Sequence, residues 1–378
     1  MSSVHHLKPG CLQRGSSLRQ EHQSPYESGH RRGLWALALI AAAAGFAFGC
    51  ATDTRRIELK VSDPNPAGTT PALASDAWAE QVTQQSAGRL TLTVYHAATL
   101  LSANELFVGV QTGIADFGVY VQNLEDNPLK DDLLLNNVVM LPFMGWPDQR
   151  STGQIYLDLL AAYPAMKDEW KGLTVVGAAM MSGMHIHNVV RDIRTPTDLS
   201  GLKTVAAAGV LTDSAHAAGA LGVSVDIAQL GEAVVDGTVD AVIDDFAELA
   251  TNNVLEPFKY HTLFGDGGIN MTPLVIIVNS DVFNSLSADL QGIVAASGSF
   301  YADQFYALDA PIQAASVAQA EAWNHSLVRL TPAEIAVWYE LVKVPVHDQW
   351  VTTCEVNGLP GQAVYADTLQ RIQAVASP

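Results

Sequence analysis

Cysteine is scarce in this sequence, which has three in 378 residues. Cys11 and Cys50 lie within the first fifty residues, so Cys354 is the only cysteine of the remaining chain. A single thiol excludes a disulfide within that remaining part, whose stability must therefore come from packing. Nothing in the sequence around Cys354 indicates a catalytic nucleophile.

Basic residues are also few, with 20 Lys and Arg against 39 Asp and Glu and a net charge of −19. Because Lys and Arg supply most of the affinity for phosphate backbones, this balance argues against a nucleic-acid partner. Charged residues make up only 16% and hydrophobic residues 48%, which is typical of a globular chain rather than a disordered one. The length suggests two domains.

The first fifty residues have the opposite charge balance, with five basic residues against two acidic ones before Cys50. Arg31 and Arg32 precede the uncharged run GLWALALIAAAAGFAFG, which stops at Cys50. A positive start, an apolar stretch and small residues before a cleavage point indicate a secretory signal. The tetrapeptide AFGC at 47–50 also resembles a bacterial lipoprotein box.

We therefore interpret residues 1–50 as a targeting segment and expect Cys50 to carry a lipid that anchors the protein to a membrane in the periplasm. The alternative is an uncleaved anchor, because about 18 apolar residues can span a bilayer. Both interpretations place the rest of the chain outside the cytoplasm.

Residues 185–246 alternate short strands with short helices. Strands are predicted at 202–205, 223–225 and 239–243, and they are separated by helices at 216–221 and 229–235. This alternation predicts a parallel α/β sheet, which binds ligands at the carboxyl ends of its strands. A short helix at 195–199 precedes the first strand, because Thr195 can cap it and proline is tolerated in a first turn.

The amino-terminal part has the same pattern. Strands are predicted at 55–61, 89–95 and 115–120, and helices at 71–86 and 104–111, followed by a helix at 154–170 and a buried strand at 173–180. An unbroken apolar strand at 272–279 brings the chain back, and helices follow at 287–327, 332–354 and 361–375. We expect lobe I at 55–180, lobe II at 181–272, and a return to lobe I with a long spanning helix in 273–378.

Five segments carry a family resemblance that runs from about Ile57 to Ile372. They are SAGRLTLTVYHAATL, NELFVGVQTGIADFG, IRTPTDLSGLKTV, ALGVSVDIAQLGEAVVDGTVDAV and PLVIIVNSDVFNSLSADLQGIV. Together they resemble the substrate-binding proteins of tripartite ATP-independent periplasmic (TRAP) transporters, of the dicarboxylate-receptor (DctP) type. The resemblance implies a periplasmic-binding-protein-like α/β fold with two lobes around a ligand cleft, joined by crossing strands and a long spanning helix.

The resemblance also implies a function. Such a receptor captures a small organic acid by closing its lobes and delivers it to membrane permease subunits that use an ion gradient. It implies no catalysis and no cofactor, and we expect a monomer. A sensory receptor on the same scaffold is an alternative that the sequence does not separate from transport.

Three positions depart from the family pattern. Thr204 stands where the family commonly has an arginine that binds the ligand carboxylate, His185 best matches a second arginine, and Asp244 lies near an amide position. The ligand is then neutral or cationic and pairs with Asp244, or it is an acid held by neutral donors with a charged His185 or with Arg191 or Arg194. A metal bridge between Asp244 and an acidic ligand is a third possibility.

A simpler interpretation of the acidic pair is that Asp244 and Asp245 cap the helix predicted at 246–252. The ligand-binding residues that we expect besides His185, Thr204 and Asp244 are Asn65, Tyr120, Phe143, Trp146 and Asn270. The aromatic residues of the loop 141–147 suit a packed turn as well as a ligand wall.

His185 and His187 share one face of a strand and suggest a metal site, for which His216 or His261 would supply a third ligand. A metal-dependent hydrolase or metal-binding protein is therefore an alternative function. No catalytic signature supports it, because the sequence lacks Gly-x-Ser-x-Gly, HExxH and Walker motifs. We predict no catalytic residues and no resident metal.

Overall fold

The computed structural model describes residues 55–122, 133–207, 209–225 and 229–376. The predicted targeting segment and its Cys50 lie outside these ranges. Within them, no helix combines the length and the apolar character needed to cross a membrane.

The first sheet has the strand order β2-β1-β3-β10-β4. Its strands are β1 (Ile57–Ser62), β2 (Leu90–Tyr95), β3 (Phe117–Val121), β4 (Leu173–Met180) and β10 (Pro273–Asn279). β1 pairs in parallel with β2 and β3, whereas β10 runs antiparallel to β3 and β4. Every residue of β10 is buried, as expected of an apolar strand covered on both faces.

The second sheet has the order β11-β9-β5-β8-β6-β7. Its strands are β5 (His185–Asn188), β6 (Lys203–Ala206), β7 (Leu221–Gly222), β8 (Ala241–Asp244), β9 (Tyr260–Leu263) and β11 (Ser326–Arg329). β6 pairs in parallel with β7 and β8, as predicted, whereas β5 is antiparallel to both β8 and β9. Both sheets are mixed because β5 and β10 run antiparallel to their neighbours.

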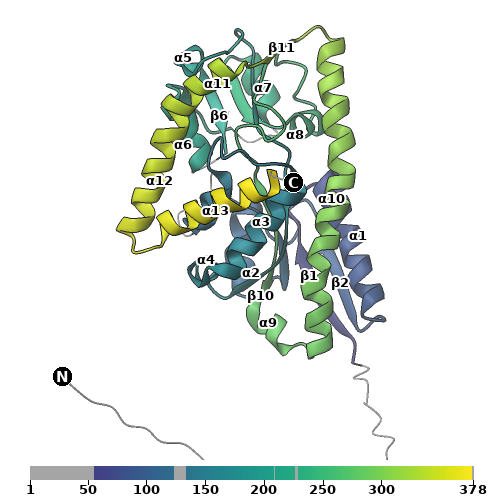
Figure 1. Cartoon of the computed structure of the whole chain (residues 1–378). Helices are drawn as coiled ribbons and strands as arrows, with labels where there is room; N and C mark the ends of the chain where they lie inside the picture. Colours follow the sequence, from purple (N-terminus) through teal and green to yellow (C-terminus); the bar gives the residue numbers. More distant parts are fainter. Residues whose placement is uncertain (1–54, 123–132, 208, 226–228, 377–378) are drawn as a thin grey trace, which may run out of the picture. The chain divides into compact units, whose positions relative to one another are not determined.

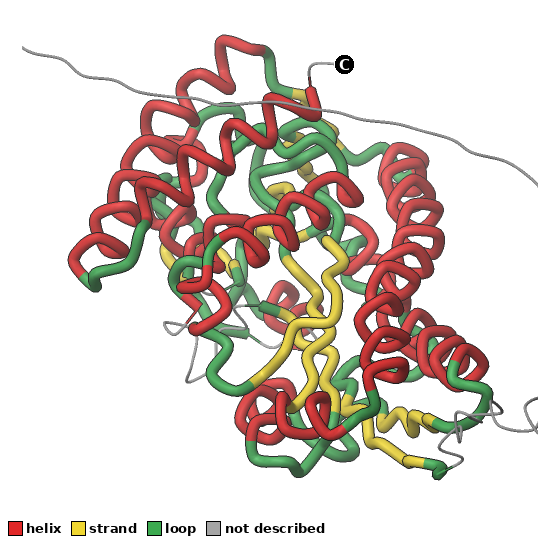
Figure 2. The backbone as a smooth tube through the Cα atoms, turned by 60° about the horizontal axis from the view of Figure 1, so that its bottom comes forward, coloured by secondary structure: helices red, strands yellow, loops and turns green. Residues whose placement is uncertain are grey.

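Helices cover the faces of the first sheet (Figures 1 and 2). On one face lie α1 (Thr70–Gln85) and α10 (Ala288–Ala322), and Trp78 of α1 donates a 2.8 Å bond to the Ser297 hydroxyl of α10. On the other face lie α2 (Ala103–Gln111) and α3 (Gln149–Ala162). α10 also approaches β4 closely, because a Cβ on Gly298 would lie 2.3 Å from the Val176 carbonyl oxygen.

α10 contacts elements of both sheets. Along its length it packs against α1, β4 and α3, and then against α8 (Phe246–Thr251) and β11 (Figure 1). The predicted spanning helix is therefore confirmed, although its predicted end at Leu327 is wrong. The helix ends at Ala322, and Ser326–Arg329 pairs with β9 as a strand of the second sheet.

The remaining helices differ from the prediction mainly at breaks. The predicted helix 154–170 is divided into α3 and α4 (Pro164–Asp168), because Pro164 occupies a first helical turn. The predicted helix 332–354 comprises α11 (Pro332–Trp338), a π turn at Tyr339–Lys343 and α12 (Val344–Val356). The other helices are α5 (Pro196–Leu199), α6 (Val210–Ala217), α7 (Leu230–Val235), α9 (Ser280–Ser285) and α13 (Gly361–Ala376).

Two α/β lobes, one for each sheet, confirm the predicted fold class. We call the first-sheet lobe I and the second-sheet lobe II. The strand predicted at 223–225 is wrong, because the edge strand of lobe II is β7. The lobe boundaries at 180 and 272 stay a prediction, although β11 shows that the chain returns to lobe II after β10.

Candidate functional site

Three segments meet where the chain crosses between the lobes: the loop 141–147, residues 181–185 and residues 264–272. Their backbones are bonded to one another, from Phe143 N to Ile269 O at 2.7 Å and from Met184 N to Asn270 O at 2.9 Å. Gly183 permits this approach, because a Cβ there would lie 2.6 Å from the Gly268 nitrogen. We call this region, together with the adjoining Asp244, the crossing site.

The crossing site contains five of the predicted ligand-binding residues. Phe143 packs against Phe264 and Trp338 with ring centroids 5.4 and 6.3 Å away. Its backbone has φ of 55°, and its carbonyl oxygen accepts a 2.6 Å bond from the Lys343 ammonium. The other four are Trp146, His185, Asp244 and Asn270.

Three buried polar atoms of the crossing site have no hydrogen-bond partner in the part of the chain that the structure describes. They are the Trp146 indole nitrogen Nε1, the Asn270 carbonyl oxygen Oδ1 and the Thr272 hydroxyl oxygen Oγ1. The Asn270 amide nitrogen, in contrast, donates a 3.0 Å bond to the Met140 carbonyl oxygen. Because buried polar groups are normally satisfied, these three atoms are candidates for hydrogen bonds to a bound molecule.

His185 and Asp244 face each other as paired residues of β5 and β8. Burial lowers the pKa of His185 to about 4, so the imidazole is neutral at pH 7. Burial, reinforced by the charge of Glu248, raises the pKa of Asp244 to about 8. Asp244 is therefore mainly protonated at pH 7, and its carboxyl group can donate a hydrogen bond.

The other cations considered from the sequence are engaged elsewhere. Arg191 donates two bonds to the Asp198 carbonyl oxygen, at 2.7 and 3.0 Å. Arg194 pairs with Glu334 at 3.0 Å. Neither arginine is placed by these contacts in the crossing site.

An acidic group adjoins Asp244. Asp245 caps α8 by accepting a 2.8 Å bond from the Glu248 nitrogen, so the capping interpretation holds for Asp245 rather than for Asp244. Asp309 of α10 accepts bonds from Gln149 and Ser182 at 2.9 and 2.7 Å. Burial raises the pKa of Asp245 and Glu248, and the charge of Asp309 adds to both shifts. Sequence reasoning missed Asp309 and its partners, because three separate segments bring them together.

The histidines do not converge on a common point. His187 Nδ1 lies 2.7 Å from His261 Nδ1, and His261 Nε2 lies 3.0 Å from His325 Nδ1, so these rings form a chain. His216 lies elsewhere, at the edge of lobe II near Gly222. Across the described ranges, no group of three or more His, Cys, Asp or Glu residues has a metal-binding arrangement.

The other predicted residues lie outside the crossing site. Asn65 donates a 2.7 Å bond to Asp63 at the carboxyl end of β1. Tyr120 packs in the core of lobe I against Phe107 and Trp170. Thr204 is buried in β6, where its hydroxyl donates to the Leu202 carbonyl oxygen at 3.1 Å.

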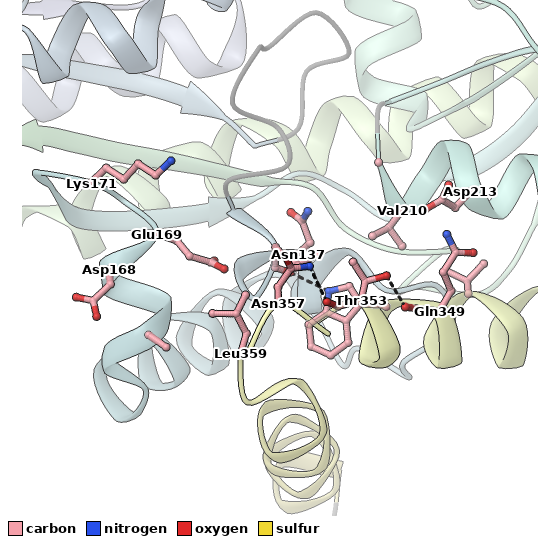
Figure 3. Close-up of a pocket in the computed structure, with 15 residues that line it drawn as sticks. Asn137, Asp168, Glu169, Lys171, Val210, Asp213, Gln349, Thr353, Asn357 and Leu359 are labelled. Atoms are coloured by element: carbon pink, nitrogen blue, oxygen red, sulfur yellow. Dashed lines mark hydrogen bonds between the residues drawn. The ribbon is translucent and has the colours of Figure 1, made fainter. Parts of the chain in front are cut away.

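A cavity of about 660 Å³ lies between elements of both lobes and α12. Figure 3 shows Asp168, Glu169 and Lys171 on one side of it and Asp213 of α6 on the other. Asn137 of the 3-10 helix η2 (Asn136–Met140) lines it, and the last residue of η2 accepts the bond from Asn270. The cavity therefore adjoins the crossing site through η2, and its volume is that of an ordinary small-molecule pocket.

The chain matches a known protein family in sequence and several solved structures in fold. Residues 61–352 match the sequence profile of bacterial extracellular solute-binding protein, family 7 (DctP). A TRAP periplasmic solute-binding protein of Desulfovibrio salexigens is similar in structure, with a TM-score of 0.71 and 25% identity over 84% of this chain and 95% of that one.

Two further structures share the fold at lower identity. A TRAP solute-binding protein of Rhodoferax ferrireducens, in complex with copurified benzoate, has a TM-score of 0.75 and 20% identity over 85% of this chain and all of that one. A Bordetella bronchiseptica TRAP protein with bound mandelate has a TM-score of 0.74 and 22% identity over 84% of this chain and 99% of that one.

A curated relative is longer than the matched region. An uncharacterised protein of Sinorhizobium fredii is 25% identical over 257 residues, which are 66% of this chain and 47% of that protein. The chain thus spans about half the length of this relative.

Proposed function

Because the chain belongs to the bacterial extracellular solute-binding proteins of family 7, we propose that it captures a small organic acid outside the cytoplasm and delivers it to the membrane permease subunits of a TRAP transporter. The family match confirms the resemblance found in the sequence motifs. Proteins of this class are periplasmic. Lipid attachment at Cys50 is part of the proposal, and a Cys50→Ser substitution should release the protein from the membrane fraction.

The unpartnered polar atoms of the crossing site carry this proposal. An unsatisfied buried donor or acceptor costs about 1–3 kcal/mol, so Trp146 Nε1, Asn270 Oδ1 and Thr272 Oγ1 together destabilise this arrangement when no solute is bound. A solute that bonds to all three removes the penalty and favours closure of the lobes around it. The cost therefore becomes a driving force for ligand-dependent closure.

The solute class follows from the donors. In the described ranges, Arg191 and Arg194 are engaged elsewhere and burial keeps His185 neutral, so none of these three residues supplies a charge for a carboxylate in the crossing site. The Trp146 N–H and the protonated Asp244 carboxyl are suitable donors, and the crossing site also contains the packed aromatic rings of Phe143 and Phe264. The relatives with bound benzoate and mandelate make aromatic acids the first candidates to test.

Thermal unfolding of the purified mature protein tests the proposal, because a ligand that binds only the folded state raises the melting temperature. The panel contains benzoate, mandelate and glucuronate, with benzamide and benzylamine as neutral and cationic counterparts. We expect an acid to raise the melting temperature and to remain chemically unchanged. A response to benzylamine alone would refute the acid and favour a cationic solute that pairs with Asp244.

Two variants locate the site. Trp146→Phe removes one donor and should weaken acid binding roughly 3- to 10-fold, as expected for the loss of one hydrogen bond. Gln349→Ala, on the exposed wall of the 660 Å³ cavity, is the matched control and should bind normally. If Gln349→Ala weakens binding and Trp146→Phe does not, the solute occupies the cavity instead.

The proposed receptor is not an enzyme. Zinc-dependent hydrolysis without binding of any panel compound would favour the metalloenzyme alternative based on His185 and His187. A sensory role predicts the same binding but no dependence of solute uptake on the permease genes.

A further inference from the structure

A chain of hydrogen bonds crosses the edge of lobe II from the surface to the crossing site. The exposed Lys259 ammonium lies 3.3 Å from His325 Nε2, His325 Nδ1 lies 3.0 Å from His261 Nε2, and His261 Nδ1 lies 2.7 Å from His187 Nδ1. His187 Nε2 ends the chain 3.2 Å from the backbone carbonyl oxygen of Asp244. We call Lys259, His325, His261 and His187 the relay.

The two end groups of the relay fix which nitrogen of each histidine carries the proton. An ammonium group has only donors and a carbonyl oxygen only accepts, so every imidazole between them must accept one bond and donate one. This assigns the proton to Nδ1 in His325, to Nδ1 in His261 and to Nε2 in His187. All four contacts are then satisfied, and all three histidines are neutral.

An added proton breaks this order. An imidazolium ion has two N–H groups and no acceptor, so one of its contacts would set a donor against a donor. His187 belongs to β5, His261 to β9, and His325 directly precedes β11. His187 and His261 are fully buried, so water does not replace the lost bond. Protonation therefore weakens the attachment between neighbouring strands.

Charged and titratable groups on the neighbouring elements surround the relay histidines. His185 of β5 faces both His187 and His261, while Lys259 and Glu256 act on His325. Asp244 and the Asp245–Glu248–Asp309 group lie at the far end. Burial is the largest cause of a lowered pKa in each of the three relay histidines, and the charge of Lys259 lowers the pKa of His261 and His325 further.

We propose that the relay is a positioning device that holds the Asp244 end of β8 in place for solute binding and releases it when a histidine is protonated. Lys259 supports it from the surface by setting its direction and repelling a proton. The inference rests on the proposed function in one respect, since Asp244 is taken as part of the solute site. The relay itself is testable in the ligand-free protein.

The first experiment is nitrogen-15 NMR of histidine-labelled mature protein without ligand. At pH 7 the expected spectra show three neutral rings with protons on His325 Nδ1, His261 Nδ1 and His187 Nε2. The opposite tautomer in any of them, or an imidazolium ion at pH 7, would overturn the relay.

The second experiment compares Lys259→Met with Lys167→Met, which removes another exposed lysine far along the chain. In Lys259→Met the pH at which the relay takes up its first proton should rise by roughly half a unit to one unit, whereas Lys167→Met should match the wild type. Lys259→Arg should restore the wild-type value, because it restores the charge and a donor. An unchanged pH in Lys259→Met would refute the role of the lysine.

Hydrogen exchange measures whether protonation of the relay loosens the strands that it connects. After correction for the intrinsic rate, amide exchange in 185–188 and 241–244 should accelerate as pH falls through the NMR midpoint, and at a higher pH in Lys259→Met. Exchange that does not follow the midpoint would leave the histidines purely structural and refute the proposal. Failure of every compound in the solute panel leaves these ligand-free results unchanged, so the two proposals fail separately.

Discussion

Substituting Asp244 by Asn should stabilise the ligand-free protein at neutral pH. The ordinary pKa of the carboxyl is 3.8, and burial raises it to about 8 in the folded protein. Folding at pH 7 must therefore protonate a group that is ionised in the unfolded chain. Over the roughly three pKa units between 3.8 and pH 7, this costs about 4 kcal/mol.

Asparagine is free of this cost, and its side-chain oxygen can still accept the bond that Asp244 Oδ1 takes from the Asp245 nitrogen at 2.9 Å. Because local rearrangement around the carboxyl offsets part of the cost, we expect a gain of about 2 to 4 kcal/mol at pH 7. The native state binds the extra proton between pH 3.8 and about 8, so wild-type stability attributable to this group falls as pH rises through that window. The gain should vanish near pH 4 and level off above pH 8.

Urea denaturation followed by circular dichroism, at half-unit steps from pH 4 to 8.5, measures the effect. Asp236→Asn is the control with the opposite sign, because bonds from Thr238 lower the pKa of Asp236 and its charge stabilises the fold. An Asp244→Asn variant that is less stable than wild type at pH 7, or whose difference from wild type is independent of pH, would show that Asp244 is ionised in the folded protein.

Three further substitutions and conditions test the packing and the charges. Gly298→Ala should destabilise the protein by about 1–3 kcal/mol, because the new Cβ meets the Val176 carbonyl oxygen. Gly292→Ala on the same helix has open space around its new Cβ and should stabilise the protein by about 0.5–1 kcal/mol. The midpoints of urea denaturation measure both effects. Glu169→Gln should cost about 1–3 kcal/mol in the same assay, because the Glu169 carboxylate accepts bonds from the backbone nitrogens of both Leu135 and Asn136; a neutral result would contradict that role. In the Asp244→Asn background, unfolding free energy should decrease as pH falls from about 6.5 towards 4, because burial lowers the pKa of His185 and of the three relay histidines and the unfolded chain binds these protons first; a flat profile over this range would contradict neutral buried histidines.

The sequence predicts the elements whose pattern is local. β2 alternates buried and exposed residues, β10 is an unbroken apolar run, and both appear within one residue of their predicted bounds. The family motifs follow these regular elements, which explains why the fold class could be assigned. The signal was strongest where side-chain periodicity and glycine-bounded turns agreed.

Short strands that depend on distant partners were not predictable. β9 and β11 have four residues each and include polar side chains, so their strand conformation comes from pairing with each other and with β5. The same pairing creates the contact of His187 with His261, which lie 74 positions apart. Sequence reasoning could identify His185 and His187 as unusual, but the partners of the pair depended on the register of the sheet.

The structure brings together only part of the predicted site, for a similar reason. Phe143, Trp146, His185, Asp244 and Asn270 meet in the crossing site, and Asp244 was recognised as a departure from the family pattern. Its raised pKa, in contrast, depends on burial and on the charge of Glu248, which the packing of α8 places nearby. Whether any of the eight predicted ligand-binding residues contacts the solute stays a prediction, for those of the crossing site as well as for Asn65, Tyr120 and Thr204.

The single proline within α10 has a mechanical consequence. Pro311 has no N–H to donate to the Ala307 carbonyl oxygen, so the helix lacks one backbone hydrogen bond there. It therefore bends more easily at that point than elsewhere. About 17 Å of helix lie between Pro311 and Ala322, so a bend of about 10° displaces the helix end by roughly 3 Å. Such a bend would move the end of α10 and the adjoining β11 relative to the part of the helix that packs on β4, so Pro311 is a point at which the two lobes can shift against each other.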